Sequence, residues 1–211
     1  REGVLDVVTG GQPTVGLRVP SHPLAIALLD GFGEGVVATS ANRHGRPSPT
    51  TADQARDEVW DRVAAVLDGG PCEGGLESTV LSLVGAPRIL RRGALGAQVL
   101  ADVLGRPVAT AASNPTHPAA TKRQLDLGVH VRILVDPHRA AVVLARHDAP
   151  QGFTGRWEVL PDAPGPWVAA LYDALRRMEA EGVDEIAVEP LPRTPDWAAA
   201  RDRLARATSQ G

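Results

Sequence analysis

The chain of 211 residues has a mass of 22.1 kDa, the size of one large domain or two small ones. Hydrophobic residues make up 43% and charged residues 22%, which is ordinary globular usage and excludes a disordered or fibrous chain. The net charge of −3 gives no overall attraction to a polyanion, and the aromatic content of 3% argues against a stacking platform for single-stranded nucleic acid.

The sequence also limits the compartment and the kinds of metal site. The single cysteine, Cys72, excludes an internal disulfide and a multi-cysteine zinc site, and the six histidines show no metal-ligand spacing. No run of about 18 apolar residues occurs, and the N-terminus has no apolar signal core. We therefore expect a cytoplasmic protein with no membrane span and no metal site of its own. Its first residues, Arg1-Glu2-Gly3, suggest a fragment of a longer protein.

The first part of the chain predicts three short strands and one helix. Residues 4–8 form an apolar run that a glycine pair closes, and residues 14–19 alternate between apolar and polar side chains. Ser21 is the expected N-cap of a helix that ends near Asp30. Residues 35–38 predict the third strand.

The middle of the chain predicts a helix, two strands and a short helix. Thr51 and Gln54 form a capping box, and the apolar face of the helix that follows ends before Asp68-Gly69-Gly70. That face consists of Ala55, Val59, Val63 and Val66. Strands are expected over residues 79–84 and 88–90, and a short helix is expected to end at Gly105.

The last part of the chain predicts a linker and a small α/β unit. Periodicity is lost from residue 106 to about 124, where Pro, Thr, Ala and Asn dominate. Apolar residues recur at helical spacing from Trp167 to Met178, and Thr194 with Pro195 is the expected start of a final helix. Strands are expected over residues 131–135, 140–144, 157–160 and 186–188.

Two polar features lie on or after strands of the N-terminal part, where α/β folds usually bind ligands. Thr14 and Arg18 share the open face of one strand, and a guanidinium can bind a carboxylate or phosphate with two hydrogen bonds. A solvated strand face is the alternative. Residues 39–42, Thr-Ser-Ala-Asn, can bind phosphate, ribose or an amino acid, or can form a local turn.

Two further features follow in the middle of the chain. The glycine-rich run over residues 69–79 can bring backbone N–H groups to an anion or can form a tight hairpin, and it lacks the lysine of a P-loop. Arg91-Arg92-Gly93 leaves a strand with two guanidinium groups. From the residues alone we expect an anion-binding cleft that suits a nucleotide and an amino acid.

The order of five segments adds a family resemblance. TVGLRVPSHP (14–23), TSANRHGRPSPT (39–50), LDGG (67–70), GLESTV (75–80) and ILRRGAL (89–95) resemble the YrdC/Sua5 family over about residues 1–105. ALYDALRRMEAEGVDEIAVE (170–189) and the helix over residues 198–207 resemble the Sua5 C-terminal domain. The resemblance implies a partial YrdC-like twisted mixed sheet with helices over residues 1–105, a linker over 106–128, and a small Rossmann-like α/β domain over 129–211.

The resemblance also implies an activity, that of an L-threonylcarbamoyladenylate synthase. This enzyme forms threonylcarbamoyl-AMP and pyrophosphate from L-threonine, bicarbonate and ATP. Magnesium would arrive with ATP, and a separate transferase would pass the product to the tRNA adenosine beside the anticodon. The resemblance assigns Arg18, Ser40 and Ser78 to L-threonine and Thr14, Asn42, Thr50 and Arg91 to ATP. It assigns no catalytic residue, because the work is positioning and electrostatic stabilisation.

The sequence departs from the family pattern in two places, and two other functions stay open. The N-terminal stretch of the family, with its Lys-x-Arg motif, is absent from the sequence, so we expect weak phosphate binding. Residues 116–123 are a degraded form of the family's linker segment, so no linker residue is assigned a role. The alternatives are carbamoyl transfer, as in hydrogenase maturation, and a non-catalytic module that contacts double-stranded RNA or tRNA. The basic patch of such a module would contain Arg18, Arg43, Arg46, Arg91 and Arg92.

Overall fold

The structure is a computed structural model that describes residues 4–110 and 125–208. It has the mixed α/β architecture that the sequence predicts, and the chain divides into two compact units between Ser40 and Ala41. The family's linker segment, over residues 116–123, lies outside the described residues. The domain boundaries expected at residues 105 and 129 stay a prediction.

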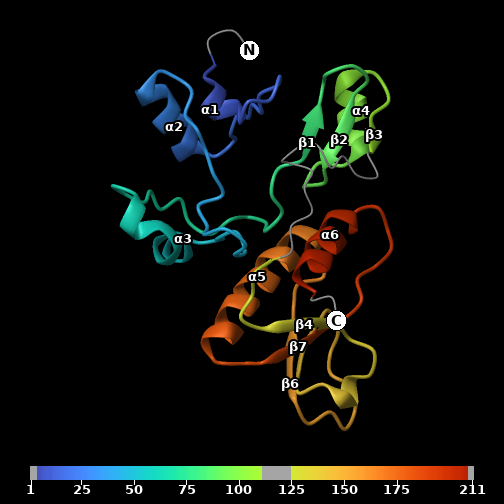
Figure 1. The fold of residues 1–211 in the computed structure, drawn as a ribbon. Helices are drawn as coiled ribbons and strands as arrows, with labels where there is room; N and C mark the ends of the chain where they lie inside the picture. The colour runs from blue at the N-terminus through green and yellow to red at the C-terminus, as the bar shows by residue number, and fades with distance from the viewer. Residues whose placement is uncertain (1–3, 111–124, 209–211) are drawn as a thin grey trace. The chain divides into compact units, whose positions relative to one another are not determined.

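The N-terminal unit contains two helices, α1 (Asp6–Thr9) and α2 (Pro23–Phe32) (Figure 1). The helix expected from residue 21 is confirmed, but its N-cap is His22 and not Ser21. The Nδ1 atom of His22 accepts a hydrogen bond from the backbone N–H of Leu24, and Pro23 occupies the first helical position.

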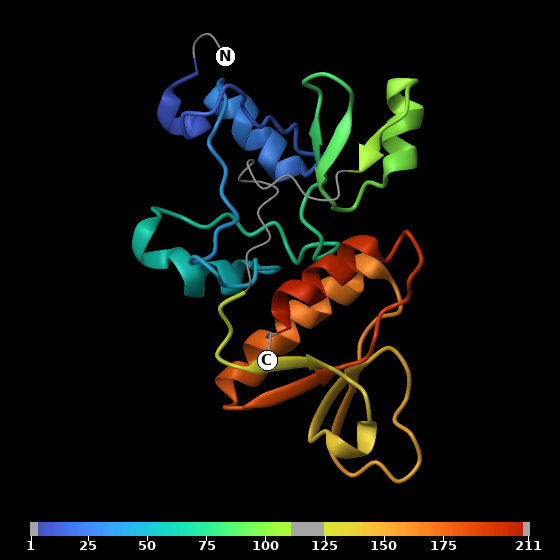
Figure 2. The ribbon, with the colours of Figure 1, turned by 45° about the vertical axis from the view of Figure 1, so that its right-hand side comes forward.

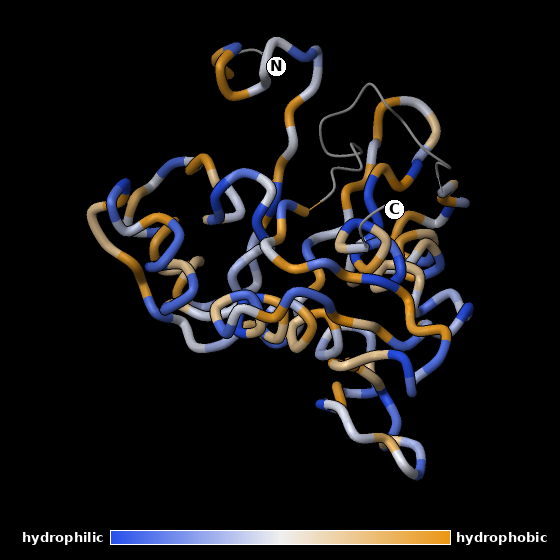
Figure 3. The backbone as a smooth tube through the Cα atoms, turned by 60° about the horizontal axis from the view of Figure 1, so that its bottom comes forward, coloured by the Kyte–Doolittle hydropathy of each residue, from blue (hydrophilic) through white to orange (hydrophobic). Residues whose placement is uncertain are grey.

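The three strands expected in this unit do not form. Residues 6–8 belong to the helix α1, and residues 14–19 and 35–38 pair with no strand in the described part of the chain. Leu17 and Val19 are 88% and 94% exposed, and orange segments alternate with blue and white ones along the tube that leads away from the N-terminus in Figure 3. A strand needs a neighbouring strand for its backbone hydrogen bonds, and the described part of this unit supplies none. An alternating pattern of apolar and polar residues is therefore not enough to form a strand when no partner strand is available.

Residues 41–110 contain a small three-stranded sheet, the helices α3 and α4 and a 3-10 turn. The sheet has the order β1-β2-β3, with β1 antiparallel and β3 parallel to β2, so it is mixed as predicted. Gly105 ends the last helix of this part in the left-handed conformation, as expected. The elements are α3 (Ala52–Val59), the 3-10 turn η1 (Trp60–Arg62), β1 (Val80–Ser82), β2 (Arg88–Arg91), α4 (Ala97–Leu104) and β3 (Ala109–Thr110).

The N-cap of α3 at Thr51 is confirmed, but the reciprocal bond of a capping box is not, because Oε1 of Gln54 accepts from the backbone N–H of Thr50. The helix is also shorter than its apolar pattern predicts. The Oγ1 atom of Thr51 accepts from the backbone N–H of Gln54 at 3.3 Å. The α-helix ends at Val59 and does not continue to Val66. Val63 already has an extended backbone and is 42% exposed, because it finds no layer to pack against. Apolar spacing extends a helix only where its face is buried.

The C-terminal part is a parallel sheet covered by two helices. Its strands have the order β4-β7-β5-β6, and α5 and α6 lie side by side on one face of this sheet (Figures 1 and 2). The expected strands are confirmed within one or two residues of their ends. The elements are β4 (His130–Ile133), the 3-10 turn η3 (Pro137–Arg139), β5 (Val142–Ala145), β6 (Arg156–Val159), α5 (Pro164–Ala180), β7 (Glu185–Val188) and α6 (Ala198–Ala207).

The main hydrophobic core lies between this sheet and its two helices. The apolar stripe expected from Trp167 to Met178 is buried there, which confirms that it is core. Trp167 meets Trp197 edge to face, with the ring centroids 6.1 Å apart. The opposite face of the sheet is smaller and is covered by Phe153 and Trp157.

The final helix begins later than the sequence predicts. Thr194 is not its N-cap, since α6 starts at Ala198, directly after Trp197. Trp197 is buried against Trp167, and the carbonyl of Thr194 instead accepts from Arg201 at 2.9 Å. Burial of a large aromatic side chain therefore sets the start of the helix.

Candidate functional site

The predicted site residues are divided between the two units. Thr14, Arg18 and Ser40 belong to the N-terminal unit, where none of them lies on a strand. The roles of these three residues stay predictions. Asn42, Thr50, Ser78 and Arg91 belong to the second unit, and the description below concerns them.

Asn42 closes a tight loop by hydrogen bonding to the backbone. Its Nδ2 atom donates to the carbonyl of Arg43 at 2.8 Å and to the carbonyl of Arg46 at 2.9 Å. Its Oδ1 atom is buried and receives no hydrogen bond in the described part of the chain. A buried acceptor without a donor is uncommon in folded proteins and needs an explanation, such as a ligand donor.

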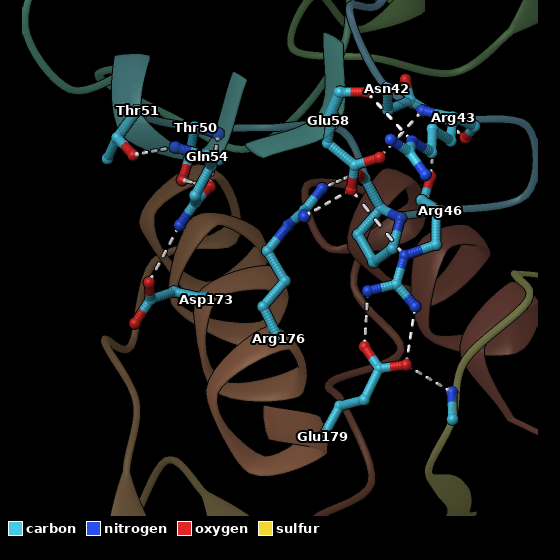
Figure 4. Close-up of polar contacts among 12 residues, drawn as sticks. Asn42, Arg43, Arg46, Thr50, Thr51, Gln54, Glu58, Asp173, Arg176 and Glu179 are labelled. Atoms are coloured by element: carbon cyan, nitrogen blue, oxygen red, sulfur yellow. Dashed lines mark hydrogen bonds and ion pairs between the residues drawn. The ribbon is translucent and has the colours of Figure 1, made fainter. Parts of the chain in front are cut away.

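Thr50 lies in the capping network of α3 (Figure 4). Its backbone N–H and its hydroxyl donate to Oε1 of Gln54, at 2.8 and 3.1 Å. The amide of Gln54 in turn donates to Oδ1 of Asp173 on α5 at 3.0 Å. The hydroxyl of Thr50 is therefore used as a donor inside the protein and can offer a ligand only its lone pairs.

Ser78 and Arg91 are brought together, as the prediction of a common site requires. The Nη2 atom of Arg91 donates to the backbone carbonyl of Ser78 at 2.9 Å, and Nε donates to the same oxygen at 3.3 Å. Arg91 forms no ion pair in the described part of the chain. Its guanidinium group thus lies beside Ser78 with donors that no carboxylate occupies.

Glu77 joins the loop of Ser78 to the loop of Thr50. One carboxylate oxygen of Glu77 accepts from the hydroxyl of Ser48 at 3.2 Å. The other accepts from Nε of Arg203 at 2.5 Å, and Arg203 also donates to the carbonyl of Arg92 at 3.1 Å. These contacts bring residues 48–50, 77–78 and 91–92 together near Arg203 of α6.

Burial and neighbouring charge perturb this cluster. Burial acts to raise the pKa of Glu77, but the charge and hydrogen bond of Arg203 outweigh it, so the pKa lies below its ordinary value of 4.5. Burial lowers the pKa of the Arg91 guanidinium, and the charge of Glu77 opposes that shift. Burial also raises the pKa of Tyr172. Arg91 is consequently a partly desolvated cation, whose attraction to an anion is stronger than in water.

The glycines of this region bring protein backbones together. A Cβ on Gly75 would overlap the backbone of Ala169 on α5, and the N–H of Gly75 donates to the carbonyl of Gly165 at 3.0 Å. A Cβ on Gly93 would overlap the backbone of Glu77 and Thr79. Gly75 therefore serves close packing, which is neither of the two functions expected for the glycine-rich run, and its N–H is not presented to an anion.

Several residues of this region were not found from the sequence. Glu58, Glu77 and Glu179 each accept from an arginine, and their partners lie up to 133 positions away in the chain. Only Glu77 had a local signal, because it precedes Ser78 in a recognised motif.

Membrane and metal features were searched for over residues 4–110 and 125–208. No helix there is long and apolar enough to cross a membrane. Within the same residues, no group of three or more His, Cys, Asp or Glu side chains could hold a metal ion.

The fold and site define a class of protein. The loops of Asn42, Thr50 and Ser78 carry amide and hydroxyl groups, strand β2 carries the guanidinium group of Arg91, and contacts with the parallel α/β domain support these loops. Residues 1–93 match the family model Sua5_yciO_yrdC, described as "Telomere recombination". Residues 108–209 match the model Sua5_C, described as "Threonylcarbamoyl-AMP synthase, C-terminal domain". The chain belongs to the Sua5/YrdC family.

Curated relatives and solved structures agree with this membership. A threonylcarbamoyl-AMP synthase of Bacillus subtilis is 32% identical in an alignment of 230 residues, gaps included. The alignment covers 95% of this chain and 64% of that protein. A threonylcarbamoyl-AMP synthase of Pyrococcus abyssi is 37% identical over 105 residues, or 49% of this chain and 31% of that protein. The chain spans less than two thirds of the length of these curated relatives.

The structure resembles solved structures of P. abyssi Sua5. The protein complexed with L-threonine matches with a TM-score of 0.82 at 27% identity, over 99% of this chain and 68% of that chain. A double alanine variant of the same protein matches with a TM-score of 0.83 at 27% identity, over 99% and 67%.

Proposed function

We propose that this protein catalyses the formation of threonylcarbamoyl-AMP from L-threonine, bicarbonate and ATP. The observation that carries the proposal is the meeting of the Ser78 loop with Arg91, beside the loop that contains Asn42 and Thr50. Similarity to relatives named threonylcarbamoyl-AMP synthase supports it. The product would serve the threonylcarbamoyl modification of tRNA in the cytoplasm, through a separate transferase.

The proposed reaction has two steps. The amine of L-threonine adds to the carbon of bicarbonate and water leaves, which gives a carbamate. A carbamate oxygen then attacks the α-phosphorus of ATP, and the bond from that phosphorus to the bridging oxygen breaks to release pyrophosphate. The protein has to hold the carbamate against the phosphorus and stabilise negative charge, and neither task needs a covalent intermediate with the enzyme.

The family resemblance assigns the nucleotide roles. The guanidinium group of Arg91 binds phosphate, and the buried Oδ1 atom of Asn42 accepts a hydrogen bond from the nucleotide. Thr14 and Thr50 lie along the nucleotide. Magnesium arrives with ATP as part of the substrate, and few protein groups hold it.

The family resemblance likewise supplies the residues proposed to contact L-threonine. Arg18 pairs with the carboxylate of L-threonine, since a guanidinium can donate two parallel hydrogen bonds to it. Ser40 and Ser78 contact the rest of the amino acid. The solved P. abyssi Sua5 complexed with L-threonine supports an amino-acid substrate.

Isothermal titration tests the proposal. The complete gene product that contains this chain should bind ATP and L-threonine, and it should release pyrophosphate only when ATP, L-threonine and bicarbonate are all present. A folded protein that binds neither ATP nor L-threonine would refute the proposal.

The RNA-binding alternative is less well supported. Arg43 and Arg46, which belong to its basic patch, are paired with carboxylates of Glu58, Asp61 and Glu179. Paired guanidinium groups contribute less to the field that attracts a polyanion. A gel shift with tRNA at low and high salt, compared with pyrophosphate release, separates the two functions. The match of residues 108–209 to the Sua5 C-terminal model likewise favours the synthase over carbamoyl transfer in hydrogenase maturation.

A further inference from the structure

Helix α5 reaches the loop of Asn42 through a bidentate ion pair. The two terminal nitrogens of Arg46 donate to the two carboxylate oxygens of Glu179, at 2.6 and 2.5 Å (Figure 4). Glu179 also accepts from the backbone N–H of Gly128 at 2.9 Å. A guanidinium and a carboxylate paired in this way fix both distance and orientation. The last turn of α5 therefore fixes the position of the Arg46 side chain.

A second carboxylate holds the other end of the same loop. Glu58, on α3, is 5% exposed and accepts from the backbone N–H of Arg43 at 3.0 Å. Arg176 of α5 donates to the second oxygen of Glu58 at 2.6 Å and also donates to the carbonyl of Pro47 (Figure 4). Residues 43–47 are thus held at both ends by side chains that α5 contributes or orients.

The pairing strengthens the charged forms of Arg46, Glu58 and Glu179. The hydrogen bond with Glu179 raises the pKa of Arg46, and the same bond lowers the pKa of Glu179. Burial acts to raise the pKa of Glu58, but the N–H of Arg43 and the charge of Arg176 lower it below its ordinary value. Loss of any member would leave a partner charge unpaired in a partly buried place.

The orientation of Asn42 depends on this network. Its amide donates to the carbonyls of Arg43 and Arg46, the two residues that Glu58 and Glu179 hold. A displacement of Arg46 therefore rotates or frees the carboxamide. The unpaired Oδ1 atom of Asn42 would then lose its fixed position.

We propose that Glu179 and Arg176 of α5, together with Glu58, are positioning residues that orient Asn42 toward ATP. None of them touches the substrate. The inference rests on the proposed function, because it concerns the same nucleotide site. It also makes ATP binding and the docking of α5 on the Asn42 loop reciprocally coupled.

Conservative variants at the bidentate pair provide the test. Glu179→Gln removes the charge and keeps the size of the side chain, and Arg46→Lys keeps the charge and removes the second hydrogen bond. We expect ATP affinity, measured by titration calorimetry, to fall by up to about tenfold in Glu179→Gln, because the displaced Asn42 carboxamide would lose a hydrogen bond to the nucleotide. Arg46→Lys should lose less affinity than Arg46→Ala.

Glu181→Gln is the matched control. Glu181 lies two positions after Glu179 and pairs with Arg156 and Arg177, which belong to the C-terminal part and not to the Asn42 loop. Glu181→Gln should leave ATP affinity unchanged, although it also removes an ion pair of the same helix end. An equal loss of affinity in both variants would contradict a specific positioning role.

A double-mutant cycle separates positioning from general stability. Arg46→Ala should lose at least as much ATP affinity as Glu179→Ala, because it also removes the ion pair with Glu58 at 3.7 Å, and the double variant should lose no more than Arg46→Ala alone. Additive losses would overturn the inference. A lowered melting temperature with unchanged ATP affinity in every single variant would also overturn it, since a purely structural pair acts that way.

The same titrations distinguish this inference from the proposed function. If the unaltered protein binds ATP and Glu179→Gln binds it equally well, only the positioning role fails. If the folded, unaltered protein binds neither ATP nor L-threonine, the proposed function fails and the positioning role fails with it.

Discussion

Arg203 and Glu77 are 126 positions apart in the chain, yet Nε of Arg203 donates to Oε2 of Glu77 at 2.5 Å. The Arg203 side chain is 1% exposed. A buried cation of this kind ties α6 to two loops, those of Ser78 and of Arg92. The pair therefore contributes to the geometry of the candidate site as well as to stability.

Removal of the buried cation should destabilise the protein strongly. Arg203→Met should lower the free energy of unfolding by about 3–5 kcal/mol, because Glu77 would keep a buried charge without its partner. Chemical denaturation of the two proteins measures the difference. The double variant Arg203→Met with Glu77→Gln should recover part of the loss, and no recovery would contradict this explanation.

Stability should also fall in acid through Glu77. The pKa of Glu77 is lower in the folded protein than its ordinary value of 4.5, so below that value the unfolded chain binds the proton first. The stabilisation is complete above the ordinary value and is lost as pH falls through the folded value. Denaturant midpoints at several pH values should show this decline, and Glu77→Gln should flatten it. A midpoint that does not change with pH in the acid range would argue against the assignment.

Arg91 should matter more for ATP than for L-threonine. Arg91→Ala should weaken ATP binding by about tenfold to a hundredfold, as expected for the loss of hydrogen bonds between charged groups. Arg92→Ala is the control, because the exposed Arg92 contributes its backbone carbonyl and not its side chain to the cluster. Equal effects of the two substitutions on calorimetric ATP affinity would exclude the phosphate role of Arg91.

Arg18 should show the opposite preference. Arg18→Ala, made in the complete gene product, should weaken L-threonine binding more than ATP binding, because its guanidinium pairs with the amino-acid carboxylate. Separate titrations with the two ligands measure the ratio of the losses. Similar losses for both ligands would contradict the assigned contact.

Gly75 should not tolerate even one methyl group. Its Cβ would overlap the backbone of Ala169 on α5, so Gly75→Ala should cost about 1–3 kcal/mol of stability. Gly96→Ala is a suitable comparison, since a Cβ there meets nothing within 4 Å and the backbone is extended. Thermal unfolding of the two variants should differ clearly, and similar unfolding curves would show that the loop moves to accommodate the methyl group.

Much of the C-terminal part could be predicted from the sequence because its signals are local. The apolar stripe of α5 and the short apolar runs of β4 to β7 each bury their faces against the next element. The strands expected at residues 14–19 and 35–38 did not form, because a strand depends on a partner that no local pattern specifies. The predicted length of α3 was also wrong, since Val63 has no layer to pack against.

In the candidate site, too, residues in local motifs could be predicted, whereas pairs between residues far apart in the sequence could not. Asn42, Thr50, Ser78 and Arg91 could be predicted because they belong to ordered motifs, and the structure brings Ser78 to Arg91, while their ligand roles stay predictions. Arg176 and Glu179 were expected only as part of a helix. Their partners Glu58 and Arg46 lie 118 and 133 positions away, so spacing along the sequence held no trace of the pairing.

The backbone bonds between the loops and the C-terminal part have a consequence for hydrogen exchange. The N–H of Gly75 is bonded to the carbonyl of Gly165, and the N–H of Asp126 is bonded to the carbonyl of Gly45. These amides can exchange with solvent only when the Gly75 loop separates from α5 and the Gly45 loop separates from Asp126. Their protection should therefore follow the opening of α5, so that the small mixed sheet and the parallel domain share one cooperative unit in slow motions.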